Sequence, residues 1–160
     1  MNAPLSSEKA LLRAAALCSR SEQCVHDMTE KLLRWGLERD AAQEVVARLV
    51  SERFIDDARY ARAYVHDKFL YNGWGPVKIE MTLRQKGIDD ETIAQALSTL
   101  QQEQIQAALL RLLEAKHRNT KGRDRRLQRA ALLRFAASRG YDMAMCYRCV
   151  DQVMQHDDDD

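Results

Sequence analysis

The most regular feature of the chain is a helical pattern of apolar positions that recurs around three glycines. The glycines are Gly36, Gly87 and Gly140, which stand 51 and 53 residues apart. Apolar residues occupy the positions eight and four before each glycine, one after it, and ten and thirteen after it. These positions hold Met28, Leu32, Leu37, Val46 and Leu49, then Ile79, Leu83, Ile88, Leu97 and Leu100, then Leu132, Ala136, Tyr141, Val150 and Val153. A period near 50 residues that keeps this register predicts a repeated supersecondary unit.

Each repeat is expected to contain three helices, because its apolar residues recur at helical spacing and no segment alternates as a strand would. We place repeat 1 at residues 7–53, repeat 2 at 56–100 and repeat 3 at 102–155, with an acidic tail at 156–160. Short connections favour compact three-helix bundles, and bundles this small should lean on one another. The predicted fold is all-α, an elongated, curved array of three tandem three-helix repeats.

Local residues predict where the helices begin and end. Each repeat glycine should end a helix, because glycine lacks the Cβ that clashes in left-handed backbone. Acids supply N-caps at the expected helix starts, since a carboxylate accepts hydrogen bonds from the first N–H groups. These acids are Asp40 in repeat 1, Asp56 and Asp57 and then Asp89 or Asp90 in repeat 2, and Asp124 in repeat 3. The final helix is expected to end near Gln155.

Composition excludes several classes of protein. The chain has two Pro and six Gly among 160 residues, and abundant Ala, Leu, Arg, Gln and Glu favour helix. No apolar run is long enough to span a membrane. The first residues lack the basic-then-apolar order of a secretory signal. We therefore expect a cytoplasmic protein with no membrane partner, whose cysteines are reduced.

The net charge of +1 conceals a basic segment at residues 111–139. This segment holds ten Lys and Arg against two acids, a local charge of +8, which leaves −7 for the rest of the chain. Within it, Arg125 and Arg129 are four residues apart and share a helix face, with Arg126 beside them. Two interpretations stay open: a face for an anionic partner, or a solvated helix surface.

Two motifs resemble the RecX family of regulators of the RecA recombinase. The first is FIDDARYARAYV at residues 54–65, and the second is GPVKI at 75–79 followed by LRQKGI at 83–88. The likeness is clearest from Leu32 to Ile88 and looser beyond Leu100. It implies tandem three-helix units and a non-enzymatic protein without cofactors. It also implies binding to RecA, chiefly to its filament on single-stranded DNA, where ATP hydrolysis, strand exchange and co-cleavage of the SOS repressor are restrained.

The candidate binding residues combine the basic segment with one loop. Arginine forks pair well with carboxylates and phosphates, and an aromatic ring could stack on bases. We expect Trp74 to be exposed, because glycines flank it, whereas Trp35 and Tyr64 should cover seams between helices. The candidates for contact with recombinase or nucleic acid are Lys116, Arg118, Lys121, Arg123, Arg125, Arg126, Arg129, Arg134, Trp74 and Lys78.

The family-motif positions look structural, as parts of a junction between repeats. They are Asp56, Asp57, Arg59, Tyr60, Tyr64, Gly75, Lys86 and Gly87. Arg59 is expected to pair with Asp56 or another acid. Cys24 stands where the family usually has Ser before a helix, and because a thiol accepts hydrogen bonds poorly, that helix start should be loose.

Other patterns are weaker. Cys146 and Cys149 have CxxC spacing, but no second pair and no nearby His completes a metal set, so we favour core packing. The four histidines are scattered, and no glycine-rich phosphate loop occurs, so we expect no catalytic residues, no metal and no nucleotide site. No heptad seam demands a dimer, so a monomer is expected. The alternative function is a nonspecific nucleic-acid-binding helical module, which rests on the basic segment alone.

Overall fold

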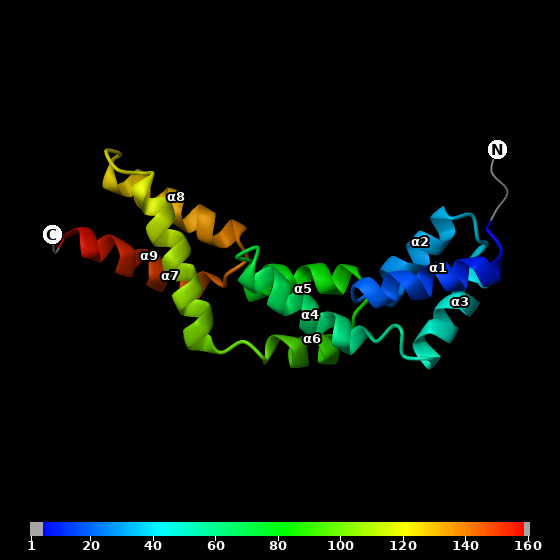
Figure 1. The fold of residues 1–160 in the computed structure, drawn as a ribbon. Helices are drawn as coiled ribbons and strands as arrows, with labels where there is room; N and C mark the ends of the chain where they lie inside the picture. Colours follow the sequence, from blue (N-terminus) through cyan, green and yellow to red (C-terminus); the bar gives the residue numbers. More distant parts are fainter. Residues whose placement is uncertain (1–4, 159–160) are drawn as a thin grey trace. The chain divides into compact units, whose positions relative to one another are not determined.

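The computed structural model describes residues 5–158, and within them every regular element is an α-helix (Figure 1). The helices of this part of the chain are α1 (Ser7–Arg20), α2 (Val25–Arg34), α3 (Arg39–Ser51), α4 (Asp57–Leu70), α5 (Pro76–Gln85), α6 (Asp90–Leu97), α7 (Gln102–Arg118), α8 (Arg125–Ser138) and α9 (Met143–Asp158). The predicted all-α class is confirmed. None of the described helices combines the length and apolar character needed to cross a membrane.

All three repeat glycines end a helix in left-handed backbone. Their φ angles are +97° at Gly36, +72° at Gly87 and +93° at Gly140. In each repeat the residue after the glycine donates its N–H to the carbonyl five positions earlier, as Ile88 does to Leu83 at 3.2 Å. This is the long hydrogen bond of the Schellman motif, which satisfies a carbonyl at the open end of a helix. The predicted helix ends are therefore confirmed, and their recurrence supports the three-repeat organisation.

The repeated apolar positions form the core. All of them are buried except Leu97, which is half-buried. Met28, Ile79 and Leu132, eight positions before the glycines, are fully buried. The residues four positions before the glycines, Leu32, Leu83 and Ala136, are fully buried as well. Because burying one large aliphatic side chain contributes about 1.5–3 kcal/mol, the recurring register accounts for much of what holds the helices together.

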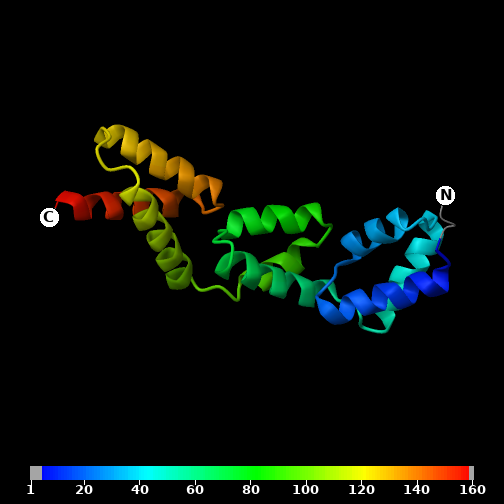
Figure 2. The ribbon, with the colours of Figure 1, turned by 45° about the horizontal axis from the view of Figure 1, so that its top comes forward.

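The chain forms two compact units. Among the described residues, unit 1 contains those up to Ala63 together with Leu83–Ile93, and unit 2 contains Tyr64–Thr82 together with those from Ala94 onward. In unit 1, α3 packs against α1 and α2. In unit 2, α7, α8 and α9 pack against one another in all three pairs (Figures 1 and 2). Repeat 2 contributes residues to both units, whereas the repeat boundaries and the curvature expected from the sequence stay predictions.

Two of the predicted N-caps are present in later repeats. Asp89 Oδ1 accepts the Thr92 N–H at 2.8 Å, which selects Asp89 over Asp90 as the cap of α6. Asp124 Oδ1 accepts the Arg126 N–H at 2.7 Å at the start of α8. These local acceptors explain why the helices begin where the sequence places them.

Two other predictions about helix ends are wrong. Asp40 does not cap α3, because the helix begins one residue before it and Glu38 is the N-cap, with no side-chain hydrogen bond. Asp40 instead lies in the first turn, where the helix dipole favours an acid. The last helix, α9, continues to Asp158, beyond the expected end near Gln155. The acidic tail thus begins inside a helix, and its residues 159–160 lie outside the described part of the chain.

Candidate functional site

The acidic pair of the first family motif caps two different helices in unit 1. Asp56 Oδ1 accepts the Arg59 N–H at 3.1 Å and so caps α4, its own helix. Asp57 Oδ1 accepts the N–H of Val25, 32 residues earlier, at 3.0 Å. Val25 is the first residue of α2. At the same helix start, the Cys24 Sγ accepts the Asp27 N–H at 3.4 Å. The start of α2, expected to be loose, therefore has two acceptors.

The Asp57 carboxyl is held in an unfavourable setting for its charge. Burial raises its pKa, and the carboxylates of Asp56, Asp89 and Asp27 add to this, together outweighing the Val25 N–H that favours the charged form. A folded-state pKa above the ordinary value of about 3.9 means that this group stabilises the fold below that pH. The contribution is lost as the pH rises through the raised folded-state pKa.

Two substitutions of Asp57 separate its charge from its hydrogen bond. Asp57→Asn keeps an oxygen that can accept the Val25 N–H, so we expect a free energy of unfolding at pH 7 no lower than that of the wild type. Asp57→Ala removes the acceptor, so it should be about 1 kcal/mol less stable than Asp57→Asn. The advantage of Asp57→Asn over the wild type should shrink as the pH falls to 4 in urea unfolding experiments. Equal stability of the two variants would show that the hydrogen bond contributes nothing.

Two basic motif residues make long-range pairs in the same unit. Arg59 Nε donates to Glu22 Oε1 at 2.6 Å, which identifies Glu22 as the acid that Arg59 pairs with. Lys86 Nζ donates to both carboxylate oxygens of Asp27, at 3.1 and 2.8 Å. Burial alone would raise the pKa of Asp27, but hydrogen bonds from Lys86 and His26 outweigh it and lower that pKa below its usual value. These contacts support the structural interpretation of Arg59 and Lys86.

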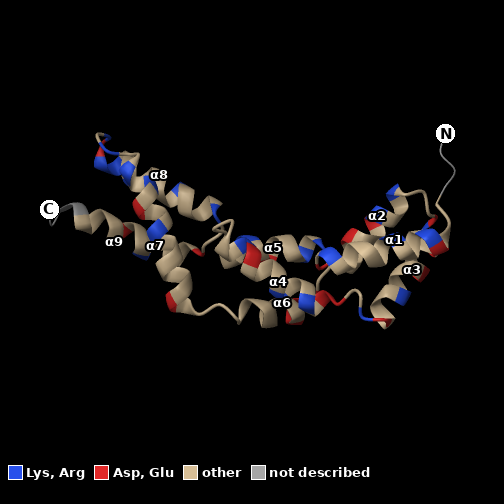
Figure 3. Ribbon diagram, in the orientation of Figure 1, with Lys and Arg blue, Asp and Glu red and all other residues tan. Residues whose placement is uncertain are grey.

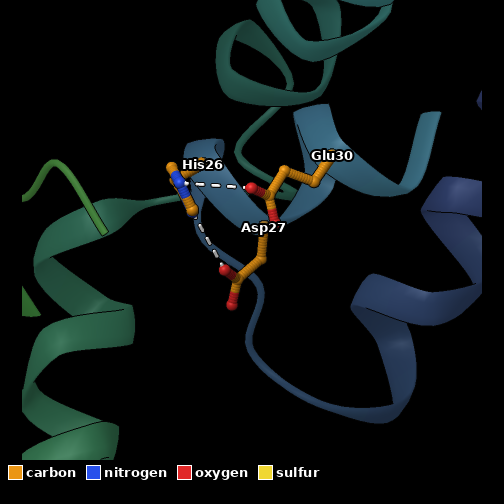
Figure 4. A group of neighbouring side chains, drawn as sticks. All are labelled: His26, Asp27 and Glu30. Carbon is orange, nitrogen blue, oxygen red and sulfur yellow. Dashed lines mark hydrogen bonds and ion pairs between the residues drawn. The ribbon is translucent and has the colours of Figure 1, made fainter. Parts of the chain in front are cut away.

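His26, Asp27 and Glu30 form the one group of potential metal ligands found among the described residues (Figure 4). The His26 Nδ1 lies 3.2 Å from Asp27 Oδ1, and its Nε2 lies 3.5 Å from Glu30 Oε1. A metal ion needs one ring nitrogen and the carboxylates to converge on a single point. One candidate ligand atom of each residue lies within 4.8 Å of the others, but Asp27 already accepts two hydrogen bonds from Lys86, which would compete with a metal ion.

In unit 2, the loop before α5 lies against the turn between α8 and α9. The Gly75 N–H donates to the Arg139 carbonyl at 2.8 Å, and the Val77 N–H donates to the Gly140 carbonyl at 2.9 Å. A Cβ on Gly75 would stand 2.6 Å from the Gly140 carbonyl carbon, and a Cβ on Gly140 would stand 2.8 Å from the Lys78 backbone nitrogen. Both positions need glycine because the two backbones approach so closely that a side chain would not fit. This approach explains why the second motif has glycine at position 75.

The residue before the repeat glycine contacts the preceding repeat in both repeats 2 and 3. Lys86 binds the Asp27 side chain in the first turn of α2, and the Arg139 guanidinium donates to the Asn72 carbonyl in the loop between α4 and α5. In both cases a cation at the end of a middle helix reaches the preceding repeat, but the acceptors differ in kind and position. Arg139 is not among the candidate site residues expected from the sequence and was counted only in the charge of the basic segment. The signal was available, because Arg139 shares its register position with Lys86.

Trp74 is half-buried, so its expected exposure is only partial. The Lys78 Nζ lies 4.4 Å and the Lys68 Nζ 4.9 Å from the ring centroid, and the Tyr64 ring meets it edge-on at 6.5 Å. Such cation–π contacts leave the ring less free to stack on a base. Tyr71, which is 82% exposed, is the open aromatic side chain of this loop.

Two surface depressions lined by residues of the basic segment lie on either side of helix α8. Lys and Arg positions gather around the start of this helix (Figure 3). The first depression, about 520 Å³ between α8 and α9, is lined by Arg125, Arg126, Arg129, Asp151, Met154 and Gln155. Arg129 Nε donates to Asp151 Oδ1 at 3.2 Å, and an Arg125 Nη donates to the Met154 carbonyl at 3.2 Å. Two of the three arginines singled out from the sequence are therefore engaged with α9.

The second depression, which we call the α7–α8 groove, measures about 440 Å³. It is lined by Lys116, Asn119, Thr120, Arg123, Ala131, Arg134, Phe135 and Ser138. No acid lines it, and Lys116, Arg123 and Arg134 form no ion pair with any described residue. The Lys116 ammonium lies 5.4 Å from the centroid of the Phe135 ring. The groove thus presents three positive charges that have no acidic partner among the described residues.

The loop between α7 and α8 is fixed by buried polar contacts. The Thr120 hydroxyl donates to the His117 carbonyl at 2.8 Å, and both side chains are buried. The Gln128 amide then donates to the Thr120 carbonyl at 2.8 Å, which ties the loop to α8. Arg123 therefore extends from an anchored loop. Arg118 and Lys121 are exposed and line neither basic depression, so the structure does not bring all the sequence candidates together.

Cys146 and Cys149 are fully buried, which confirms the expected core packing. Burial raises the pKa of the Cys146 thiol to about 11, with smaller contributions from Asp142 and Cys149. Burial also raises the pKa of Cys149. Because the thiolate is the reactive form, such thiols stay protonated and inert at neutral pH.

Comparison with known proteins gives one consistent family. A family model described as "RecX, second three-helix domain" matches residues 56–97. The regulatory protein RecX of Streptomyces coelicolor is 30% identical over 154 residues, covering 92% of this chain and 81% of the relative. That of Leuconostoc mesenteroides is 31% identical over 156 residues, which cover 97% of this chain and 58% of the relative. The chain therefore spans somewhat more than half the length of the Leuconostoc protein.

Solved structures show the same fold. A crystal structure of regulatory protein RecX superimposes with a TM-score of 0.78 at 21% identity, over 91% of this chain and 73% of that one. The crystal structure of RecX from Lactobacillus salivarius gives a TM-score of 0.76, also at 21% identity, over 94% and 95% of the two chains. At this level of identity the likeness establishes the all-α repeat fold and nothing finer.

Proposed function

Because this chain belongs to the RecX family of regulatory proteins, we propose that it binds the RecA recombinase and restrains its activity. The preferred target is the RecA filament on single-stranded DNA. The affected activities are ATP hydrolysis, strand exchange and co-cleavage of the SOS repressor. The protein acts in the cytoplasm as a monomer, without a cofactor and without performing bond chemistry itself.

The observation that carries this proposal is the match to regulatory protein RecX across 92% of the chain. The α7–α8 groove supports it, because a filament on DNA is strongly anionic and three cations that form no ion pair with any described residue would steer and hold it. The fixed turns at Gly87 and Gly140 support it as well. The Gly87 turn fixes the end of α5, and the Gly140 turn accepts backbone hydrogen bonds from the start of α5, so within unit 2 a partner would meet a preformed surface with little ordering cost.

Regulation by binding alone follows from differential affinity. A protein that prefers one state of the filament shifts the equilibrium only by the difference between its binding free energies for the two states. A tenfold shift needs about 1.4 kcal/mol, which one or two ion pairs that form in only one state could supply. No catalytic group in the regulator is required for this effect.

The proposal is tested by adding the protein to RecA on single-stranded DNA at substoichiometric ratios. We expect the rate of ATP hydrolysis and the yield of strand exchange to fall as the protein is added, because one bound molecule affects several protomers of a filament. Filament length, followed in parallel by electron microscopy, should respond as well. Absence of any change in all three readouts would contradict the proposal.

A second candidate is a nonspecific nucleic-acid-binding module, favoured by the uncompensated charge of the α7–α8 groove. Such a module would bind bare DNA as tightly as a RecA filament, and its affinity would fall steeply with salt. Comparing the two affinities at several salt concentrations distinguishes it from a recombinase regulator.

A further inference from the structure

We infer that the α7–α8 groove binds the phosphodiester backbone of single-stranded nucleic acid, with Lys116, Arg123 and Arg134 contacting phosphates. The inference rests on the proposed function, because the RecA filament contains single-stranded DNA. It adds that the nucleic acid of the filament, and not the recombinase, binds in this groove. The competing reading is that the groove receives carboxylates of the recombinase.

The charges of the groove differ from those on the other side of α8. In the depression between α8 and α9, Asp151 accepts a hydrogen bond from Arg129 and supplies a local counter-charge. The α7–α8 groove has cations from α7, from the loop and from α8 but no acid in its lining. Like charges that face one depression repel one another, and an anion entering the groove relieves that repulsion.

The cations are spread along α8 rather than gathered at one point. Arg134 lies nine residues into α8, so at about 1.5 Å per residue it stands roughly 14 Å along the axis from the first residue of the helix. Arg123 precedes that first residue. A single carboxylate or phosphate is too small to meet both ends. A nucleic-acid strand carries one phosphate per nucleotide, about every 3.4 Å in a stacked strand, and so presents several charges over this distance.

The remaining lining also suits a nucleic-acid strand. Asn119 adds amide groups, and polar side chains of this kind commonly contact phosphate and sugar oxygens. Phe135 offers a half-buried ring against which a sugar or base can pack, beside the Lys116 ammonium. Protein interfaces are also enriched in Arg, but they centre on buried aromatic or aliphatic anchors. The groove has no exposed large apolar side chain to act as such an anchor.

Two matched pairs of arginines on the same segment test the inference. The groove variant carries Arg123→Gln and Arg134→Gln, and the control carries Arg125→Gln and Arg129→Gln, whose arginines engage α9. Both variants lose two positive charges. Binding of a fluorescein-labelled oligothymidylate is followed by anisotropy between 25 and 200 mM salt (roughly the range in which counterion release dominates binding). Circular dichroism confirms that each variant is folded.

We expect the groove variant to lose about 1.4 from the slope of log affinity against log salt, at about 0.7 per phosphate contact. The control should lose less than half as much. If both variants lose the same slope, the groove is not the site and the inference is overturned. If the groove variant keeps its slope but no longer restrains RecA ATP hydrolysis, the groove contacts protein. The inference then fails while the proposed function survives.

The reverse outcome is also distinguishable. If the groove variant shows the expected loss in slope but the wild-type protein has no effect on RecA, the inference stands and the proposed function fails. The two claims are thus separated by one set of proteins and two assays.

Discussion

Replacing Gly140 with Ala is expected to lower the free energy of unfolding by about 3 kcal/mol or more. Gly140 has a φ of +93°, a conformation that costs other residues about 1–2 kcal/mol. The new Cβ would also overlap the Lys78 Cβ and stand 2.8 Å from the Lys78 backbone nitrogen and 3.0 Å from its Cα. These atoms belong to the first turn of α5 and cannot swing aside. Relieving the clash must disturb backbone, at a cost of about 1–3 kcal/mol.

Gly87→Ala is the matched control for this effect. Gly87 occupies the same place in repeat 2 and has a φ of +72°, but a Cβ there would meet nothing within 4 Å. This variant should show only the backbone strain, about 1–2 kcal/mol. Urea unfolding followed by circular dichroism measures both. Equal losses would mean that α5 does not approach the Gly140 turn closely in solution.

Leu83→Ala is expected to cost about 3–5 kcal/mol. Leu83 is fully buried and stands four positions before Gly87, a position whose occupant is fully buried in all three repeats. Truncation removes apolar surface that was shielded from water and leaves a cavity that surrounding side chains fill incompletely. The loss should appear as a midpoint of thermal unfolding that is lower by about 6–20 °C for a chain of 160 residues.

Met81→Ala, two residues earlier on α5, is the comparison for that loss. Met81 is 53% exposed, so its removal should change the free energy of unfolding by less than about 0.5 kcal/mol. The contrast tests the apolar register that the sequence repeats. If Met81→Ala destabilised the protein as much as Leu83→Ala, the face of α5 assigned to the core would be wrong.

The local features of the fold could be predicted from the sequence. Helical periodicity and the three glycines identified the helices and their ends, because helices and Schellman turns are determined by residues within a few positions of each other. The same holds for the caps at Asp89 and Asp124. The prediction that Asp40 caps α3 was wrong because several acids stand near the helix start, and the backbone conformation decides which residue is the N-cap.

Contacts between distant residues could not be predicted. Asp57 serves Val25 across 32 residues, and Gly75 meets the turn at Gly140 from another repeat. Neither contact leaves a signal in local composition. The basic segment shows the same limit, because a count of charges along the chain cannot tell which arginines face an acid on a neighbouring helix. Arg129 lies beside Asp151, whereas Arg134 faces the groove.

A comparison of binding affinities tests whether this protein regulates RecA by binding its filament. RecA filaments are assembled on single-stranded DNA with a non-hydrolysable ATP analogue, so that binding is measured without turnover. The protein is titrated against these filaments, against the same DNA alone and against RecA alone at physiological salt. We predict affinity for the filament at least about tenfold above that for either component, a difference of about 1.4 kcal/mol. Equal affinity for bare DNA and filament would contradict the account.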